Sequence, residues 1–340
     1  MSVSILVPVL DEAGRLRSTV PAMLGQRHEG DLELLLIDGG STDGTREILA
    51  ELARGDARIR VLDNPAGSIP AALNLGLAAA RGEYVARMDA HAWYPADYVA
   101  LGVERLAPGD VEWVSGPAVP RGDGRWSRRV ARALLLSLGQ GGSRKWRAVG
   151  AGDEEWDLDT GVFAGVWRRA TLQTLGGWDD TFTVNEDAEM AGRVLSRGGR
   201  IVCRARMAAY YAPRDSLAAL ARQYWRFGSF RVRTSRRHPV ALRPAHVASA
   251  LLAAAVAVVP LAPLRRPASL ACGLYVLMLA SGVTRMEGDL PVAERAGTAA
   301  ALATMHLSWG AGFLAGCLRH GPPLRALGRL VLTSASRGAP

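Results

Sequence analysis

Cysteine and lysine are scarce in this 340-residue chain, and their scarcity argues against several kinds of protein. The three cysteines, Cys203, Cys272 and Cys317, show no CxxC spacing and cannot all pair, so neither a disulfide scaffold nor a cysteine-ligated zinc site is expected. The only lysine is Lys145, and no Walker or GxGxxG motif occurs. The sequence therefore gives little support to a P-loop or a dinucleotide-binding fold.

Acidic residues are scarce in the C-terminal part of the chain. Residues 216–340 carry 15 arginines and 3 acids, a net charge of +12, whereas residues 1–215 carry 26 basic and 29 acidic residues. The long apolar runs lie in the same basic part. Positive charge beside apolar sequence favours a membrane surface as the partner and disfavours nucleic acid.

We also expect no secretory leader at the start of this sequence. The run Val3–Val9 is apolar, but it is short, lacks a basic leader and continues into Asp11 and Glu12. We therefore expect the first half to stay in the cytoplasm and to be anchored from its C-terminal end. A hydrophobic fraction of 49% with 21% charged residues allows a sizeable core, in one large domain or two ordinary ones.

Up to about residue 215, short apolar runs alternate with segments of helical period. Continuous apolar runs bounded by polar turns are typical of buried parallel strands. Repeated strand–helix–strand units predict an α/β fold whose ligand loops lie at the carboxyl ends of the strands. The predicted strands are Val3–Val9, Leu32–Ile37, Arg58–Leu62 and Tyr84–Met88, and the predicted helices are Arg15–Leu24, Arg46–Ala53 and Pro70–Ala80.

The remaining sequence predicts helices at or in a membrane. Leu217–Arg237 mixes aromatic residues, among them Trp225, Phe227 and Phe230, with six arginines, as an interfacial helix does. Apolar runs follow at Ala245–Leu264, Pro267–Val283 and Ala296–Leu318, and a span needs about 20 apolar residues. The third run favours a span, and the first two form either two spans or a re-entrant hairpin. The predicted domains are a catalytic domain over 1–215, a connector over 216–244, membrane helices over 245–318 and a basic tail over 319–340.

Two loops carry residues suited to a nucleotide and a metal. Asp38-Gly39-Gly40-Ser41-Thr42-Asp43 follows the second strand, where glycines allow close backbone approach and aspartates accept hydrogen bonds from a base or ribose. Asp89 and His91 follow the fourth strand and are spaced so that a carboxylate and an imidazole can share one metal. A capped strand–helix turn and a surface turn would explain the same residues without a ligand.

Two further clusters are suited to transfer chemistry. Glu186 and Asp187 are adjacent carboxylates, so one can act on substrate while the other braces the loop. A carboxylate beside an acceptor hydroxyl is the general base that a displacement at a sugar carbon needs. On the basic helix, Arg226 can hold a leaving diphosphate. Acids decorating a helix N-terminus and aromatics anchoring at a membrane interface are the simpler explanations of these two clusters.

In this order, the clusters resemble the family 2 glycosyltransferases, which are inverting enzymes with a GT-A fold. The resemblance covers about residues 3–230. It rests on Val7-Pro8-Val9-Leu10-Asp11-Glu12, Asp38 to Asp43, Asn74-Leu75-Gly76, Asp89-Ala90-His91, Thr160-Gly161, Trp167-Arg168-Arg169, Gly176-Gly177-Trp178-Asp179, Glu186-Asp187, and Gln223 with Arg226.

The resemblance implies a role for each of these positions. Asp187 would be the catalytic base with Glu186 beside it, and Asp89 and His91 would meet the diphosphate and a divalent cation, Mn²⁺ or Mg²⁺. The family norm at the metal motif is Asp-x-Asp, and an imidazole favours Mn²⁺. The residues implied in donor binding are Pro8, Asp11, Glu12, Asp38, Asp43, Asn74, Gln223 and Arg226.

The Asp-Ala-His form with C-terminal apolar helices is similar to bacterial exopolysaccharide enzymes of the succinoglycan type. Those enzymes extend a lipid-diphosphate-linked oligosaccharide at the inner face of the membrane. Phe227 stands where the family has a tryptophan after its Gln-x-x-Arg motif. This departure, together with the few apolar runs, favours transfer of one sugar per visit over processive synthesis.

We therefore expect inverting transfer of one sugar from a nucleotide sugar to a lipid-linked saccharide at the bacterial inner membrane. A UDP-sugar is favoured as the donor, a GDP-sugar stays open, and no nucleic acid is involved. One alternative is a polyprenyl-phosphate glycosyltransferase, whose phosphate acceptor needs no general base. Another is a non-catalytic nucleotide-sugar-binding partner, against which the carboxylates Asp89, Glu186 and Asp187 argue.

Overall fold

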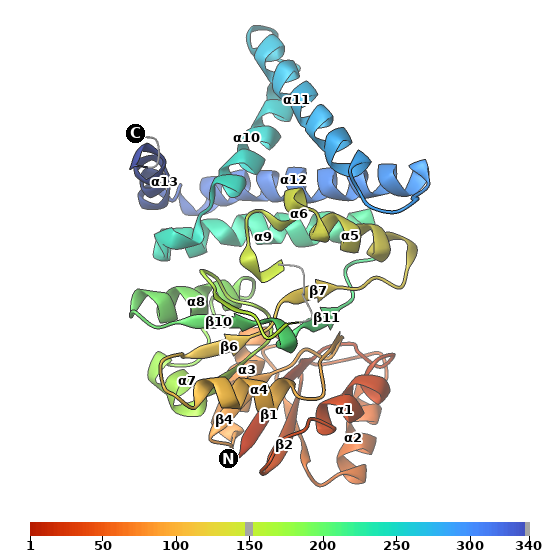
Figure 1. Cartoon of the computed structure of the whole chain (residues 1–340), viewed down its shortest axis with the longest axis vertical. Helices are drawn as coiled ribbons and strands as arrows, with labels where there is room; N and C mark the ends of the chain where they lie inside the picture. The colour runs from red at the N-terminus through yellow and green to blue at the C-terminus, as the bar shows by residue number, and fades with distance from the viewer. Residues whose placement is uncertain (147–151, 337–340) are drawn as a thin grey trace. The chain divides into compact units, whose positions relative to one another are not determined.

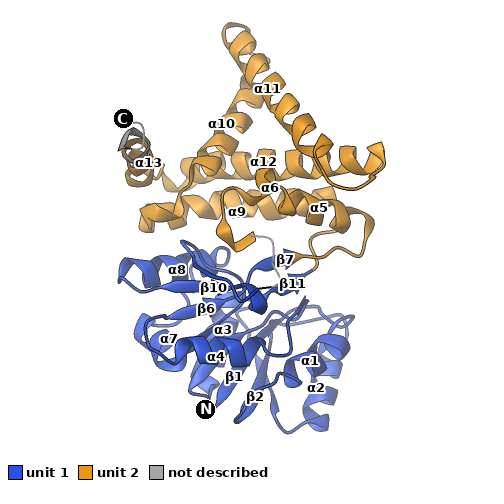
Figure 2. Ribbon diagram, in the orientation of Figure 1, with its two compact units in different colours: residues 1–119, 147–211 blue, residues 120–146, 212–340 orange. Residues whose placement is uncertain are grey.

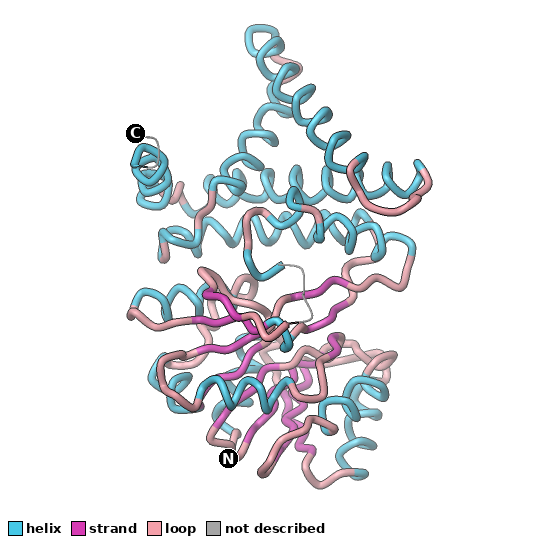
Figure 3. Tube along the Cα trace, viewed as in Figure 1, coloured by secondary structure: helices cyan, strands magenta, loops and turns pink. Residues whose placement is uncertain are grey.

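A computed structural model describes residues 1–146 and 152–336 of the chain. Its contacts divide the chain into two compact units, shown in blue and orange in Figure 2. The first unit consists of residues 1–119 and 147–211, and the second of residues 120–146 and 212–340. Nearly all of the described strands lie in the first unit, whereas the second is built from helices (Figure 3).

The first unit is organised around a mixed sheet of eight strands in the order β3-β2-β1-β4-β9-β6-β10-β8. The pairs β1–β2, β2–β3, β1–β4 and β6–β10 are parallel, while β9 is antiparallel to both β4 and β6. The strands are β1 Val3–Val9, β2 Leu32–Asp38, β3 Ile59–Asp63, β4 Tyr84–Arg87, β6 Trp113–Ser115, β8 Glu155–Asp157, β9 Gly165–Arg168 and β10 Ile201–Arg204.

Helices flank this sheet, and the strands and helices predicted before residue 90 are confirmed to within two residues at each end. The central strands β1 and β2 are buried over most of their length, as continuous apolar runs require. Figure 1 labels the helices of the first unit, which are α1 Leu16–Leu24, α2 Thr45–Gly55, α3 Ile69–Ala79, α4 Tyr98–Leu106, α7 Arg169–Leu175 and α8 Glu186–Ser196.

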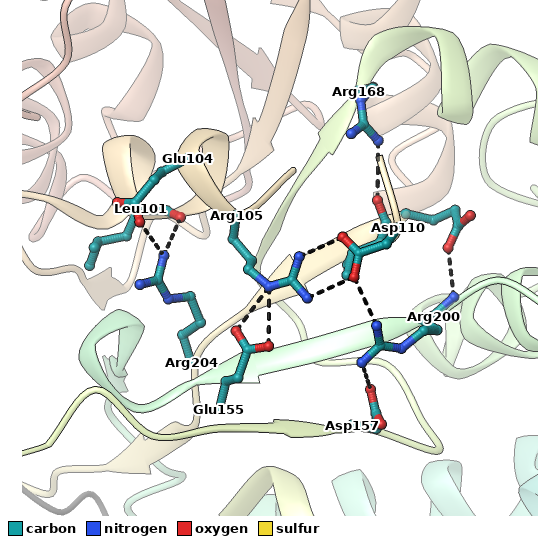
Figure 4. Close-up of polar contacts among 11 residues, drawn as sticks. Leu101, Glu104, Arg105, Asp110, Glu155, Asp157, Arg168, Arg200 and Arg204 are labelled. Carbon is teal, nitrogen blue, oxygen red and sulfur yellow. Dashed lines mark hydrogen bonds and ion pairs between the residues drawn. The ribbon is translucent and has the colours of Figure 1, made fainter. Parts of the chain in front are cut away.

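A network of ion pairs fixes the β8 edge of the sheet to α4 (Figure 4). Arg105 donates to both oxygens of Asp110, at 2.7 and 3.0 Å, and to Glu155 at 2.9 Å. Arg200 continues the network to Asp110 and to Asp157. The hydrogen bonds and positive charge of Arg105 lower the pKa of Asp110 to about 2. Bidentate geometry makes this network more specific than a scatter of surface pairs.

A second, three-stranded sheet has the order β5-β11-β7, with β5 Ala92–Trp93, β7 Ala118–Pro120 and β11 Ala209–Tyr211. Strand β5 directly follows the Asp89–His91 loop. Tyr94, the residue after β5, accepts a hydrogen bond from the Asp89 backbone N–H at 2.7 Å. This hydrogen bond therefore holds the end of β5 against the Asp89–His91 loop.

The second unit contains α5 Arg125–Leu135, α6 Ser137–Gln140, α9 Leu217–Arg237, α10 Pro244–Val258, α11 Arg265–Thr284, α12 Val292–His320 and α13 Leu324–Ser336. The segment 120–146 groups with these helices because Arg129 and Arg132 of α5 both bind Glu294 of α12. Helix α9 has the limits that the sequence predicts, and the hydroxyl of Ser216 caps its first turn.

Helices α9 and α12 lie in close backbone contact along their length. A Cβ added to Gly312 would lie 2.1 Å from the carbonyl oxygen of Trp225, and one on Gly228 would lie 2.0 Å from that of Trp309. Gly316, one turn beyond Gly312, faces Ser229 in the same way. Only glycine allows backbones to approach this closely, so these three positions fix the helix pair.

Two described segments, Ala262–Thr284 and Val292–His320, are long and apolar enough to cross a membrane, judged by length and composition alone. They correspond to the second and third apolar runs of the sequence. The first run forms α10, which has 15 residues and ends at Val258, short of the length of a span.

Candidate functional site

The loops that follow β1, β2 and β4 meet at one edge of the main sheet. Strand β1 pairs in parallel with both neighbours, so that Val9 lies beside Asp38 and Leu6 beside Arg87. Because the carboxyl ends of parallel strands face the same way, this pairing brings three sequence motifs together. They are the Asp11-Glu12 loop, the Asp38–Asp43 loop and the Asp89–His91 loop.

Hydrogen bonds join the first two loops directly. The backbone N–H groups of Asp11 and Glu12 donate to the hydroxyl oxygens of Ser41 and Thr45, at 2.9 and 2.8 Å. In return, the Asp11 carboxylate accepts from the Thr42 N–H at 2.8 Å. Asp11 adopts a φ of 52°, which a non-glycine residue rarely does. Such backbone strain is typical of functional loops that their surroundings hold in place.

The two predicted aspartates of the second loop have different surroundings. Asp38 is 1% exposed, and its carboxylate accepts from Arg46 at 2.8 Å and from the Gly40 and Ser41 N–H groups. Burial raises its pKa, but these hydrogen bonds outweigh burial and lower it overall. Asp43 is exposed, and its hydrogen bond with Thr45 lowers its pKa. Asp38 therefore shapes the loop from inside, whereas Asp43 stands at its surface.

Arg87 lies at the centre of the site and connects two of the predicted acids. Its Nε donates to Asp89 Oδ1 and its Nη1 to Glu186 Oε1, each at 3.0 Å. The Arg87 side chain is 3% exposed, and burial disfavours its charge. The negative charges of Asp89, Glu186 and Asp187 outweigh burial and raise the pKa of Arg87. A single buried guanidinium thus compensates three carboxylates, one from the loop after β4 and two from α8.

Glu186 and Asp187 begin α8 but occupy different environments. Glu186 is 8% exposed; its burial and the neighbouring Asp187 charge raise its pKa, against the opposing effect of Arg87. Asp187 is half-buried. Gly161 lies directly against this turn, since an added Cβ would be 2.2 Å from the Asp187 carbonyl oxygen. The two adjacent carboxylates therefore differ in burial, Glu186 being buried and Asp187 only half-buried.

Glu12 and His91 form a pair across two loops, with 3.1 Å between Glu12 Oε1 and His91 Nδ1. Burial disfavours charge on His91, but the hydrogen bond to Glu12 and the charges of Asp89 and Glu12 raise its pKa overall. The Glu12 side chain is 12% exposed and that of His91 is 44% exposed. Glu12 thus contacts the imidazole through Nδ1, and Nε2 is the ring nitrogen that this contact does not use.

These residues fit a divalent cation that is shared with a substrate. Within residues 1–146 and 152–336, no three His, Cys, Asp or Glu side chains gather closely enough to hold a metal by themselves. Asp89 and His91 can supply one oxygen and one nitrogen ligand. Magnesium and manganese at nucleotide sites characteristically take their remaining ligands from phosphate oxygens and water.

Asn74 does not join this cluster. Its side-chain amide donates to the Trp178 carbonyl at 2.8 Å and to Asp180 at 3.0 Å, and its Oδ1 accepts from the Trp178 N–H. Both ends of the amide are therefore used to hold the Gly176–Asp180 turn against α3. The sequence groups Asn74 with the donor-binding residues, and that assignment stays a prediction beside these observed contacts.

Gln223 and Arg226 lie in the second unit, on α9. Gln223 is half-buried and Arg226 is exposed, and they lie five and two residues before Gly228, which contacts α12. Pro8 lies within β1 and is half-buried between the buried residues Val7 and Val9. The structure thus brings Glu12, Asp38, Asp89, His91 and Glu186 to one sheet edge. Gln223 and Arg226 belong to the second unit.

Sequence reasoning missed Arg87 and Tyr94. Arg87 ends a strand that is buried at all four positions, and a charged residue in such a strand signals a paired role. Its partner Glu186 lies 99 positions away, so the pairing itself could not be inferred. Tyr94 follows the metal motif by three residues, and no pattern in the sequence marks it.

The sheet order, with its parallel half and the acidic loops at its carboxyl edge, defines the first unit as a GT-A nucleotide-diphospho-sugar transferase fold. A solved structure with the same fold is the mannosyltransferase PcManGT from Pyrobaculum calidifontis, in complex with GDP-Man and Mn²⁺. It is 22% identical with a TM-score of 0.57, and the match covers 94% of this chain and 87% of that chain.

Two sequence comparisons identify the family. The family model for "Glycosyl transferase family 2" matches residues 4–170. The chain is also 32% identical over 322 residues to the succinoglycan biosynthesis protein ExoA of Rhizobium meliloti (strain 1021), covering 91% of this chain and 93% of that protein. A shorter match, 36% identical over 87 residues, links 26% of this chain to 25% of the uncharacterized glycosyltransferase EpsJ of Bacillus subtilis (strain 168). The chain belongs to glycosyltransferase family 2.

Proposed function

We propose that this glycosyltransferase transfers a single sugar, with inversion, from a nucleoside-diphosphate sugar to a lipid-linked saccharide during exopolysaccharide assembly. A UDP-sugar is the favoured donor. Membership of family 2 supports the reaction class, and the match to a succinoglycan biosynthesis protein over most of both chains supports the biological role. Two apolar helices and the arginine-rich C-terminal part support a location at the bacterial inner membrane, with the catalytic domain in the cytoplasm.

One observation carries the proposal: Arg87 binds Asp89 and Glu186 at 3.0 Å each, with Asp187 next in the chain. A sugar transfer needs a group at the diphosphate and a base at the acceptor, held a short distance apart. The buried guanidinium of Arg87 joins the loop that carries Asp89, proposed at the diphosphate, to α8, which carries the proposed base Asp187. It also offsets the repulsion that three close carboxylates would otherwise exert.

The donor would occupy the loops at the carboxyl edge of the sheet. We assign Pro8, Asp11 and Asp43 to the surroundings of the nucleoside, with the buried Asp38 holding their loop in shape. Gln223 and Arg226 are proposed to contact the diphosphate, since a guanidinium matches phosphate oxygens through several donors. The hydrogen bonds between the Asp11 and Ser41 loops support a site that is formed before the donor arrives.

Asp89 and His91 would hold a divalent cation, favoured as Mn²⁺, together with the donor diphosphate. When bound, such a cation supplies positive charge that stabilises the departing diphosphate. Glu12 is a positioning residue, because its hydrogen bond to Nδ1 fixes the tautomer in which Nε2 carries the lone pair.

Asp187 is the proposed general base. As the acceptor hydroxyl oxygen attacks the anomeric carbon, Asp187 takes the hydroxyl proton. The bond from the anomeric carbon to the diphosphate oxygen breaks, and its electron pair leaves with the nucleoside diphosphate. Attack from the face opposite the leaving group inverts the anomeric configuration. Glu186, bound to Arg87, is proposed to hold Asp187 in place.

The first test replaces the base. Asp187→Asn should lower transfer to a lipid-linked saccharide by about 10²–10⁴-fold while leaving donor binding nearly unchanged, because general-base catalysis contributes about that much. The matched control is Glu47→Gln, an exposed acid on α2. Calorimetry with UDP- and GDP-sugars measures donor binding, and a radiolabelled-sugar assay measures transfer. Full activity of Asp187→Asn would contradict the assignment and would favour a lipid phosphate as the acceptor.

The second test addresses the positioning role of Glu12. Glu12→Gln should weaken Mn²⁺ binding in the presence of UDP by about 10–100-fold, which is the usual loss when the partner of a metal-binding histidine is removed. Glu51→Gln, at an exposed position on α2, is the control. Titration calorimetry reads the affinity without turnover. An unchanged Mn²⁺ affinity would remove Glu12 from the metal site.

A further inference from the structure

Helices α11 and α12, the two apolar helices of the second unit, differ sharply in how much protein covers them. In the apolar part of α11, only 17% of the residues are buried, compared with 44% in α12. Leu270, Leu274 and Leu277 on α11 are each at least 60% exposed. Large apolar side chains in such a row, with no protein over them, are characteristic of a surface that contacts lipid.

Helix α12, in contrast, is covered by a strongly basic helix. Its Gly312 and Gly316 contact the backbone of α9 at Trp225 and Ser229. Helix α9 carries six arginines, at positions 222, 226, 231, 233, 236 and 237. If α12 crossed the bilayer, α9 would have to enter with it, and burying this many arginine side chains at the centre of a membrane is strongly unfavourable.

The α10–α11 hairpin packs against α12 at both of its ends, the start of α10 and the end of α11, which we call its feet. At one foot, His246 of α10 stacks on Trp309, with 4.6 Å between ring centroids, and Gly310 faces the Ser249 carbonyl. At the other, Arg295 of α12 donates to the carbonyl of Val283 at 2.7 Å. Figure 1 shows the result, in which α10 and α11 are two sides of a triangle and α12 is the third.

The interior of α12 is also tied to α11 by polar contacts. Tyr275 Oη and His306 Nδ1 lie 2.9 Å apart, and His306 Nε2 lies 3.0 Å from the Leu138 carbonyl oxygen on α6. Helix α12 therefore contacts the hairpin at both feet and at this intermediate point, and supports it along its length. A helix used in this way has little apolar surface left to offer to lipid.

Charge supports the same arrangement. No aspartate or glutamate occurs between residues 216 and 286, while Arg243 and Arg285 lie next to the two feet of the hairpin. Arg265 and Arg266 begin α11 at the turn of the hairpin, where their long side chains can extend toward head groups while their stems stay in the apolar region. Arginines at these positions can bind the phosphate groups of anionic lipids, whose surface attracts basic segments near apolar ones.

We propose that the α10–α11 hairpin inserts into the bilayer, whereas α12 lies along the membrane surface with α9 and does not cross. The partner is the hydrocarbon region of a bilayer with anionic head groups. As a consequence, the loop before α12 and the loop after it lie on the same side of the membrane. This inference rests on the membrane association proposed above, and it fixes which helix enters the lipid.

Cysteine labelling tests the topology independently of enzyme activity. Single cysteines are placed by Asp289→Cys before α12, Pro322→Cys after it and Leu277→Cys on the exposed face of α11. All three are made in the full chain with Cys272→Ala and Cys317→Ala, and Cys203 is fully buried. Each variant is treated with a membrane-impermeant maleimide in inside-out and right-side-out vesicles of phosphatidylethanolamine and phosphatidylglycerol.

We expect positions 289 and 322 to react in the same vesicle orientation and position 277 to react in neither. Labelling of 289 and 322 in opposite orientations would show that α12 crosses, and would overturn the inference while leaving membrane association intact. Labelling of 277 as fast as 289 would show that the hairpin stays in water and would overturn it as well. Failure of the chain to bind the vesicles at all would instead overturn the proposed membrane location.

Discussion

The two units place charge and apolar surface in opposite ways. In the first unit, buried carboxylates such as Asp38 and Glu186 each bind an arginine or backbone N–H groups, and large apolar side chains are mostly inside. In the second, most of the large apolar residues on α11 are exposed, and close packing depends on glycine. Paired buried charges therefore stabilise the first unit. The second unit is held by close backbone contacts and leaves an apolar surface on α11 exposed.

The largest effect should come from removing the compensating charge of the first unit. Arg87→Met leaves Asp89 and Glu186 close together without their shared cation, and breaking a buried pair in this way costs about 3–5 kcal/mol of folding free energy. Scanning calorimetry should show a large fall in the melting temperature of the first unit.

A paired variant sharpens this expectation. Adding Glu186→Gln to Arg87→Met removes one of the uncompensated charges, so the double variant should be more stable than Arg87→Met alone. If the two variants melt at the same temperature, charge compensation does not explain the role of Arg87.

A smaller effect should follow from disturbing the glycine contact of the second unit. In Gly312→Ala, the new Cβ would stand 2.1 Å from the Trp225 carbonyl oxygen, so α9 must move away. Overpacking of this kind costs about 1–3 kcal/mol. Gly273→Ala on α11 is the control, because an added Cβ there has no neighbour within 4 Å. Hydrogen exchange should increase in α9 for Gly312→Ala and stay unchanged for Gly273→Ala.

The smallest effect concerns the ion pairs at the sheet edge. The pKa of Asp110 is lowered to about 2 in the folded protein, from an ordinary value of 3.8. Its carboxylate therefore contributes stability that is fully present above about pH 4 and is lost as the pH falls toward 2. Melting curves of the wild type and Asp110→Asn should differ most near neutral pH and converge toward pH 2. A constant difference across this range would exclude ionisation of Asp110 as the cause.

Much of the first unit could be predicted because its signals are local. Strand β1 has the predicted limits, Val3–Val9, since a continuous apolar run bounded by polar turns has few other solutions. The glycines and acids of the Asp38–Asp43 run could be assigned to a strand–helix loop for the same reason. The family was also predictable, because its motifs occur in a fixed order along the chain.

Contacts between distant residues could not be predicted in this way. The motif order gives no sign that the Asn74 amide contacts a turn more than 100 positions away. The segment 120–146 carries no composition signal that links it to the C-terminal helices. Its arginines find Glu294 only in the folded chain.

The sequence by itself determined the alternation of strands and helices, the family and the candidate acids, because each depends on spacing within a short segment. Only the tertiary structure decided that Arg87 joins Asp89 to Glu186 and that Glu12 orients His91. It also decided that α9 covers α12 while leaving α11 bare. These features depend on which side chains meet after the chain folds, and one-dimensional spacing does not encode the partner of a buried charge or of a glycine contact.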